Sequence, residues 1–306
     1  MRGLAGVALM AGAMACFAAM DTTTKFLSVA VPALMVIWAR SVFQLGFTCA
    51  TLLPRRGRAV LRTRHPAMQC ARAVLLLGTS LTGYIGIRAM PLPEFTSIVL
   101  LTPLALTLVS AFVLRQPVPG FRWLCVAAGF AGALLVLRPQ AHGTAAVALL
   151  ALAIVATNTA YQWVTSRVAR IDDASTTQFY TGAVGTLVTT LAVPFVWLPL
   201  TGLQWAQVGL VCVLGMSGHQ LLISAYGRGV VSQLAPYLYL QLAFATLSGW
   251  LVFSHTPDAW SRAGLALIAA SGVFAAVMEK RRSLTGQPAS ARVETRVPSV
   301  RQSPRS

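Results

Sequence analysis

The chain has 306 residues, of which 56% are hydrophobic and 10% charged, and its mean hydropathy is +0.70. One soluble core would not use so much apolar surface, so this composition excludes an ordinary soluble protein and indicates an integral membrane protein. The formal net charge of +17 does not indicate a nucleic-acid partner, because no basic face interleaved with aromatic residues accompanies it.

Apolar runs long enough to cross about 30 Å of hydrocarbon predict an all-α polytopic protein with ten transmembrane helices. The runs are joined by short turns, and we expect the bilayer to be the surrounding partner. The predicted spans are Leu4–Phe26, Ala33–Leu53, Gln69–Arg88, Pro93–Leu114, Phe121–Arg138, Thr144–Val164, Ser175–Trp197, Trp205–Tyr226, Ser232–Phe253 and Trp260–Met278.

The distribution of basic residues predicts the orientation. With the N-terminus in the cytoplasm, fifteen Lys and Arg residues, Arg72 among them, fall on the cytoplasmic side. Only Arg88, Arg138 and Arg262 fall outside. This positive-inside bias favours a multi-pass protein of a bacterial-type inner membrane with both termini cytoplasmic.

Two segments outside the main pattern need separate interpretation. The first apolar run has no convincing small-residue cleavage site, so we interpret it as a retained helix. Residues 283–306 mix Ser, Pro, Gln and Arg with few large apolar groups, and we expect a disordered, basic cytoplasmic tail. The five cysteines lack metal-ligand or disulfide spacing and are expected to pack.

Similarity between two segments of the sequence predicts that the chain consists of two halves. The segment Phe121–Arg138 resembles Trp260–Ala275, and each closes a group of five helices. A repeat of five spans must insert with opposite orientation, which gives inverted repeats over residues 1–140 and 141–282. Substrate would then bind between the halves, near the midplane.

Several short stretches together resemble the EamA branch of the drug/metabolite transporter superfamily. They are Met20–Leu27, Trp38–Ser41, Leu101–Leu104, Gly129–Gly132, Leu137–Pro139, Gly218–Tyr226 and Tyr237–Phe244. They look most like the subgroup that includes riboflavin and S-adenosylmethionine importers. The resemblance covers Leu4 to Arg282, and it implies ten helices and transport of a small molecule.

The chain departs from this family at two helix ends. The family usually carries a Gly-Glu pair after the fourth and ninth helices, where this chain has Arg115-Gln116 and Ser254-His255. The loss of both carboxylates argues against energetic coupling through these positions. An equally good interpretation is that the family's carboxylates cap or pack the helix ends. His255 offers a titratable group in place of one of them.

Three charged residues in the first two spans are the leading candidates for a substrate site. Asp21 and Lys25 stand at i and i+4, a good orientation for an ion pair, and Arg40 lies within the second span. They line a cavity in one interpretation, with Arg40 directed at a ligand carboxylate or phosphate. In the other, Lys25 extends to the interface and Asp21 neutralises Lys25 or Arg40.

Polar residues in later spans complete the candidate substrate-binding set. An imidazole could exchange protons or could be a neutral hydrogen-bonding group between helices. The aromatic and amide side chains suit either a planar metabolite or interhelical contacts. These residues are His219, Tyr237, Gln241, Asn158, Gln162 and Trp163.

Proline and glycine predict local helix geometry. Pro103 should kink the fourth helix, and Pro236 should do the same at the start of the ninth. Gly129 with Gly132, and Gly264 with Gly272, should allow close approach of the two closing helices.

Taken together, the sequence predicts a secondary transporter that moves a small polar metabolite by alternating access. The alternatives are a scaffold or receptor without transport and a membrane enzyme, but we find no clustered acid, base or metal ligands. We therefore expect no catalytic residue, no metal and no cofactor. A homodimer is left open, because small-residue faces serve packing within one bundle or between two.

Overall fold

The computed structural model describes residues 2–113, 115, 118–137, 145–168, 171–228 and 234–284. The predicted disordered tail lies outside them, except that the last helix continues to Leu284. The α-helices are α1 (Arg2–Leu27), α2 (Ala33–Arg56), α3 (Pro66–Ala89), α4 (Leu92–Val99), α5 (Thr102–Leu108), α6 (Gly120–Leu137), α7 (Ala145–Val168), α8 (Ala174–Ala192), α9 (Gly202–Arg228), α11 (Leu240–Phe253) and α12 (Ala259–Leu284). Three 3₁₀ turns, η1 (Gly57–Leu61), η3 (Val193–Val196) and η4 (Ala235–Tyr239), and one π-helical turn, η2 (Val109–Val113), complete the order.

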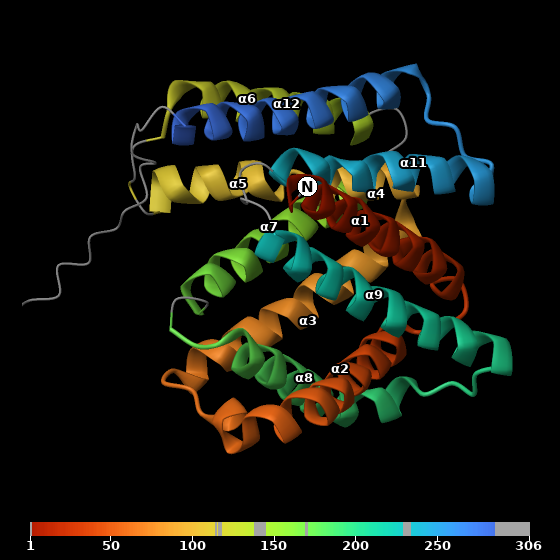
Figure 1. The fold of residues 1–306 in the computed structure, drawn as a ribbon. Coiled ribbons are helices and arrows are strands. Elements are labelled where there is room, and N and C mark those ends of the chain that lie inside the picture. The colour runs from red at the N-terminus through yellow and green to blue at the C-terminus, as the bar shows by residue number, and fades with distance from the viewer. Residues whose placement is uncertain are drawn as a thin grey trace, which may run out of the picture.

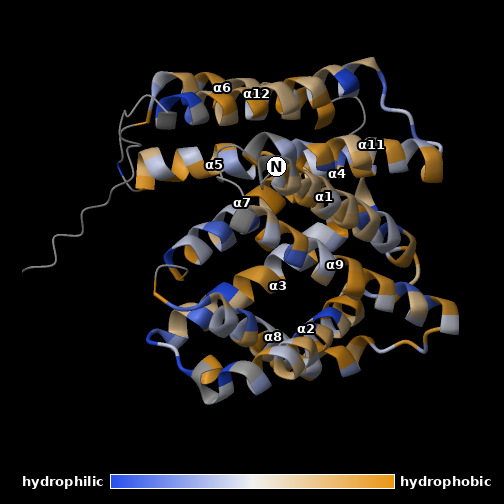
Figure 2. Cartoon of the chain, in the orientation of Figure 1, coloured by the Kyte–Doolittle hydropathy of each residue, from blue (hydrophilic) through white to orange (hydrophobic). Residues whose placement is uncertain are grey.

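The helices confirm the predicted all-α polytopic membrane protein. Within the described ranges, nine helical segments are long and apolar enough to cross a membrane, and the shorter apolar segment Tyr237–Phe253 is the tenth. Large hydrophobic side chains are exposed on the outside of the bundle, as a hydrocarbon environment requires. Figure 2 shows hydrophobic residues along the helices and strongly hydrophilic ones mainly near their ends.

The helices pack in pairs that each join an early and a late segment (Figure 1). At one side of the bundle α6 lies against α12, and the next layer contains α4, α5 and α11. Below it α1 packs on α9 and α3 on α7, and α2 with α8 forms the opposite side.

The fourth predicted helix is broken, as Pro103 predicts. Helix α4 ends at Val99, and α5 begins at Thr102, with Pro103 in its first turn. Proline has no N–H to donate and its ring clashes with a continuing helix, so the break falls just before it. The Thr102 hydroxyl donates to the Val99 carbonyl over 2.6 Å and satisfies one backbone acceptor at the break. Pro236 likewise lies in the 3₁₀ turn η4 rather than in a continuous helix.

The two positions where the sequence departs from the family pattern share an unusual backbone. Arg115 has φ of 50° and Ser254 has φ of 51°, the left-handed region that glycine adopts most easily. At Ser254 this conformation ends α11. A non-glycine residue there costs about 1 to 2 kcal/mol. The helix end at Ser254 is therefore a position where a glycine would fit without strain, while Gln116 lies outside the described residues.

The closing helices touch backbone to backbone. A Cβ on Gly264 would lie 2.6 Å from the Gly132 carbonyl oxygen, and one on Gly132 would lie 2.8 Å from the Gly264 carbonyl oxygen. Arg122 near the start of α6 and Glu279 near the end of α12 form an ion pair at 2.8 Å. The expected close approach of these helices is confirmed for Gly132 and Gly264. By contrast, Gly129 has its tightest contact with Leu104 of α5, and Gly272 with Tyr239 of η4.

Gly264→Ala should therefore destabilise the fold. The added methyl meets backbone that cannot rotate away, and overpacking of this kind typically costs about 1 to 3 kcal/mol. The measurement is thermal unfolding of the purified protein in detergent. Gly209→Ala is the matched control, because a Cβ there meets nothing within 4 Å. Equal unfolding temperatures for the two variants would contradict the close contact.

Candidate functional site

A cavity of about 680 Å³ lies inside the bundle. Its lining comes from α1, α2, α3, α4, α7, α8, α9 and α11, so both ends of the chain contribute. At one end it reaches Asp172, in the α7–α8 connection. Its lining includes no described residue of the α1–α2, α3–α4 or α11–α12 connections at the opposite end. The cavity therefore opens toward the α7–α8 end of the molecule.

Asp21, Arg40 and Gln241 come together in the cavity wall. The Asp21 carboxylate is only 5% exposed and accepts a hydrogen bond from the Gln241 amide over 3.3 Å. Arg40 is within electrostatic range of Asp21. Its guanidinium makes no hydrogen bond or ion pair with the described residues, so its donors remain available to a ligand.

His219 and Asn158 also line the cavity. The His219 ring lies edge-on to Phe17, with centroids 5.1 Å apart. This contact depends on Gly218, since a Cβ there would lie 2.7 Å from the Phe17 ring. The Asn158 amide donates to the Ile154 carbonyl over 3.1 Å, which fixes its side chain on α7.

Lys25 is held away from Asp21. Its ammonium donates to the carbonyls of Ile87 and Met90, each over 2.8 Å, at the C-terminal end of α3. A cation at a helix C-terminus satisfies unpaired carbonyls and the helix dipole. Lys25 and Asp21 form no ion pair in the described structure, because Lys25 instead ties α1 to α3.

The other predicted residues do not line the cavity. Gln162 is exposed on α7, and Tyr237 is 37% exposed. The guanidinium carbon of Arg167 lies over the Trp163 ring, 4.4 Å from the ring centroid. The cavity thus brings together five of the nine predicted residues: Asp21, Arg40, Asn158, His219 and Gln241.

Contacts between connections close the end opposite the opening. His255, at the position of the family's second carboxylate, lies 3.3 Å from Glu94 at the start of α4. The Tyr84 hydroxyl donates to the Val31 carbonyl over 2.7 Å. The Phe26 and Phe253 rings lie tilted by 36° to each other, with centroids 4.9 Å apart. These contacts join α1, α3, α4 and α11 at that end.

Arg72 is a cavity residue that the sequence reasoning missed. It was counted among the cytoplasmic charges, yet it is only 8% exposed and faces the cavity from α3. Its position three residues after Gln69 places both on one helix face, and Gln69 is 1% exposed. Two polar residues on one face of a predicted span were the available signal.

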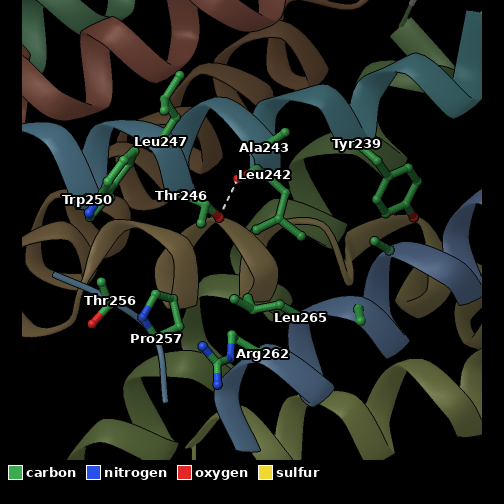
Figure 3. A pocket seen from close by; sticks show the side chains of 12 residues that line it. Tyr239, Leu242, Ala243, Thr246, Leu247, Trp250, Thr256, Pro257, Arg262 and Leu265 are labelled. Atoms are coloured by element: carbon green, nitrogen blue, oxygen red, sulfur yellow. Dashed lines mark hydrogen bonds between the residues drawn. The ribbon is translucent and has the colours of Figure 1, made fainter. Parts of the chain in front are cut away.

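A second hollow of about 690 Å³ lies between α11 and α12. Figure 3 shows Leu242, Thr246 and Trp250 on α11 facing Leu265 and Arg262 on α12. Its lining is mostly apolar, in contrast to the charged central cavity. The central cavity is therefore the better candidate for binding a polar molecule.

Asp172 fastens the connections at the open end. The Thr63 hydroxyl donates to its carboxylate, as do the Gln69 amide over 2.8 Å and the Arg64 backbone N–H over 3.4 Å. Burial alone would raise the pKa of Asp172, but these hydrogen bonds outweigh it and hold the pKa below its ordinary value. The ionised Asp172 carboxylate thus joins the α7–α8 connection to α3.

Comparison with known proteins finds transporters along almost the whole chain. A riboflavin transporter of Rhizobium johnstonii is 27% identical over 287 residues, covering 92% of this chain and 94% of its own. An S-adenosylmethionine uptake transporter of Rickettsia felis is 24% identical over 285 residues, covering 91% and 94%. The pseudopaline exporter CntI of Pseudomonas aeruginosa is 26% identical over 272 residues, covering 86% and 93%.

A solved crystal structure shares the fold. It has 20% sequence identity and a TM-score of 0.61, and the match covers 92% of this chain and 99% of the other. No family model matches the chain. The relatives and the apolar helices together establish a multi-pass membrane protein similar to bacterial small-molecule transporters.

Asp172→Asn should lower stability at neutral pH but not in acid. Because folding lowers the pKa of Asp172, its charged carboxylate stabilises the fold at pH values above its pKa in the unfolded chain, which is about 4. This stabilisation is lost as the pH falls through the lowered pKa of the folded protein. We expect the free energy of unfolding to fall by about 1 kcal/mol at pH 7. The effect is no larger because the carboxylate is partly exposed to solvent. Thermal unfolding in detergent at several pH values measures it.

Asp173→Asn is the matched control for this experiment. Its carboxylate pairs with Arg56 at 3.2 Å, but both side chains are more than half exposed, so little stability should depend on the pair. A stability gap between wild type and Asp172→Asn that persists unchanged into acid would contradict the role given to the charged carboxylate.

Proposed function

We propose that this protein is a secondary transporter that moves a small polar or amphipathic metabolite across a bacterial inner membrane by alternating access. We place it in the EamA branch of the drug/metabolite transporter superfamily. Three relatives named as transporters or exporters each match at least 86% of the chain, which supports the transport assignment. The EamA assignment rests on the short stretches of sequence that resemble that branch.

The observation that carries the proposal is a central cavity that reaches Asp172 at one end and has no described residue of the α1–α2, α3–α4 or α11–α12 connections in its lining. Its wall holds Asp21, Arg40 and His219 among apolar and aromatic side chains, which is the lining expected for a noncovalent metabolite site. Charged side chains at membrane depth are costly and typically mark a substrate or ion pathway. A scaffold would need neither the cavity nor these charges.

The helix pairing supports two inverted repeats, which we assign to residues 1–140 and 141–282. If α4 and α5 count as one interrupted span, the first and third helices of one half pack on the third and first of the other. The second, fourth and fifth each pack on their counterparts. A two-fold axis relating the halves would generate this pattern, and inverted repeats allow alternating access around a shared site.

The distribution of basic residues supports an orientation with both termini in the cytoplasm. The α2–α3 and α7–α8 connections then lie on the cytoplasmic side, so the cavity is open inward. The contacts that include Glu94 with His255 and Lys25 with the end of α3 would form the outer closure. Transport would require these contacts to separate while the Asp172 end closes.

Within the cavity we assign binding to Asp21, Arg40, Asn158, His219 and Gln241. Arg40 would contact an anionic or polar group, and the amides would orient the ligand. Asp21 and His219 are the groups through which a proton gradient would act, if transport is coupled to one.

Asp21→Asn and Arg40→Gln should each lower transport about 10-fold or more, because each removes a buried charge from the site. The measurement is uptake by proteoliposomes of labelled riboflavin, S-adenosylmethionine, pseudopaline and amino acids, with and without a pH gradient. Asp173→Asn, an exposed carboxylate outside the cavity, should transport like wild type.

Two outcomes would count against the proposal. Absence of saturable flux for every compound in the panel would favour a scaffold or receptor. Normal flux in both correctly assembled variants would show that Asp21 and Arg40 serve packing rather than substrate binding.

A further inference from the structure

We propose that Arg72 forms an oxyanion subsite in the central cavity, which binds a carboxylate or phosphate group of the transported metabolite. The subsite consists of Arg72 with Tyr161, Thr165 and Thr181. This inference rests on the proposed transport function and adds a chemical class of substrate to it.

Three hydroxyl groups hold the Arg72 guanidinium in place. Its Nε donates to Thr165 over 2.9 Å, one Nη to Thr181 over 2.5 Å, and the other Nη to Tyr161 over 2.8 Å. The guanidinium carbon also lies 5.0 Å from the centroid of the Tyr161 ring. A guanidinium has five N–H groups, so one on each Nη is left for a ligand. Those two can contact both oxygens of a carboxylate or phosphate.

The charge of Arg72 has no counterion in the described structure. Arg56 pairs with Asp173 and Arg122 with Glu279, although both are more exposed than Arg72. The three hydroxyls around Arg72 are neutral, so they satisfy hydrogen bonds without balancing the charge. A buried charge is normally paired, and a bound anion would supply the missing partner.

The nearby carboxylate of Asp172 already has other partners. It accepts hydrogen bonds from Thr63, Gln69 and Arg64, and it forms no ion pair with Arg72 among the described residues. Asp172 therefore leaves the Arg72 guanidinium available.

Arg72 and Arg40 line the same cavity. Arg40 stands near Asp21, whose opposite charge offsets it, whereas Arg72 is uncompensated. The subsite at Arg72 is therefore the more selective for an anion. Its partners Thr165 and Thr181 share the wall with Thr177 and Gln178, close in sequence to the α7–α8 connection, so it lies toward the open end.

The test is transport into proteoliposomes of probe pairs that differ only in an oxyanion. Riboflavin and riboflavin 5′-phosphate are one pair, and N-acetylated amino acids with their carboxamides are others. We expect wild type to prefer the anionic member. Arg72→Gln should raise the KM for the anionic probe about 10- to 100-fold, with a smaller change in kcat. This is the effect expected when hydrogen bonds to a charged group are lost. The neutral member should be little affected.

Two further variants separate binding from folding. Arg72→Lys keeps the charge but loses the two-pronged geometry, so its KM for the anionic probe should lie between those of wild type and Arg72→Gln. Tyr161→Phe leaves Arg72 in place without one of its acceptors, and KM should rise only for the anionic probe. Size-exclusion profiles and thermal unfolding check that each variant is assembled.

The outcomes distinguish this inference from the proposed function. Saturable transport of both kinds of probe, with KM values for the anionic probes that are equal in wild type, Arg72→Gln and Tyr161→Phe, would overturn the oxyanion subsite and leave the transporter assignment intact. Absence of transport for every probe in wild type would overturn the transporter assignment and the subsite with it. A KM effect confined to anionic probes would establish the subsite.

Discussion

The cost of placing charge in hydrocarbon arranges the interior of this protein. On insertion scales a charged side chain at the centre of a membrane helix costs about 2.5 to 3.5 kcal/mol, and a backbone group without a partner costs several. Asp21 and Arg72 are accordingly buried inside the bundle with hydrogen-bond partners. The Lys25 ammonium donates hydrogen bonds to carbonyls at the C-terminal end of α3. The same cost makes a water-accessible cavity the natural place for charges left without a partner.

The fold was largely predictable from apolar runs. Hydrocarbon thickness fixes the length of a span, so ten spans could be placed within a few residues of their ends. Pro103 predicted the break between α4 and α5 because its missing N–H acts locally. Arg115 and Ser254 adopt left-handed geometry although neither is glycine, which residue type alone would not indicate.

The site was only partly predictable, because a polar residue on a membrane helix can face a cavity or a neighbouring helix. Asp21 and Arg40 line the cavity, but the i, i+4 spacing of Asp21 and Lys25 suggested a pair that the structure does not form. The carbonyls that attract Lys25 come from residues 62 and 65 positions away, beyond any local pattern. Arg72 was counted only among the cytoplasmic charges, because its distant hydroxyl partners on α7 and α8 could not be seen in sequence.

The contact between Gly132 and Gly264 limits how the bundle can move. Carbonyl oxygen of one helix meets backbone of the other there, with no side chain between them to change rotamer or slide. Helices α6 and α12 should therefore turn as one rigid unit. Any exchange of accessibility between the two faces of the membrane then requires movement between this pair and the other helices, or among those helices, rather than sliding of α6 along α12.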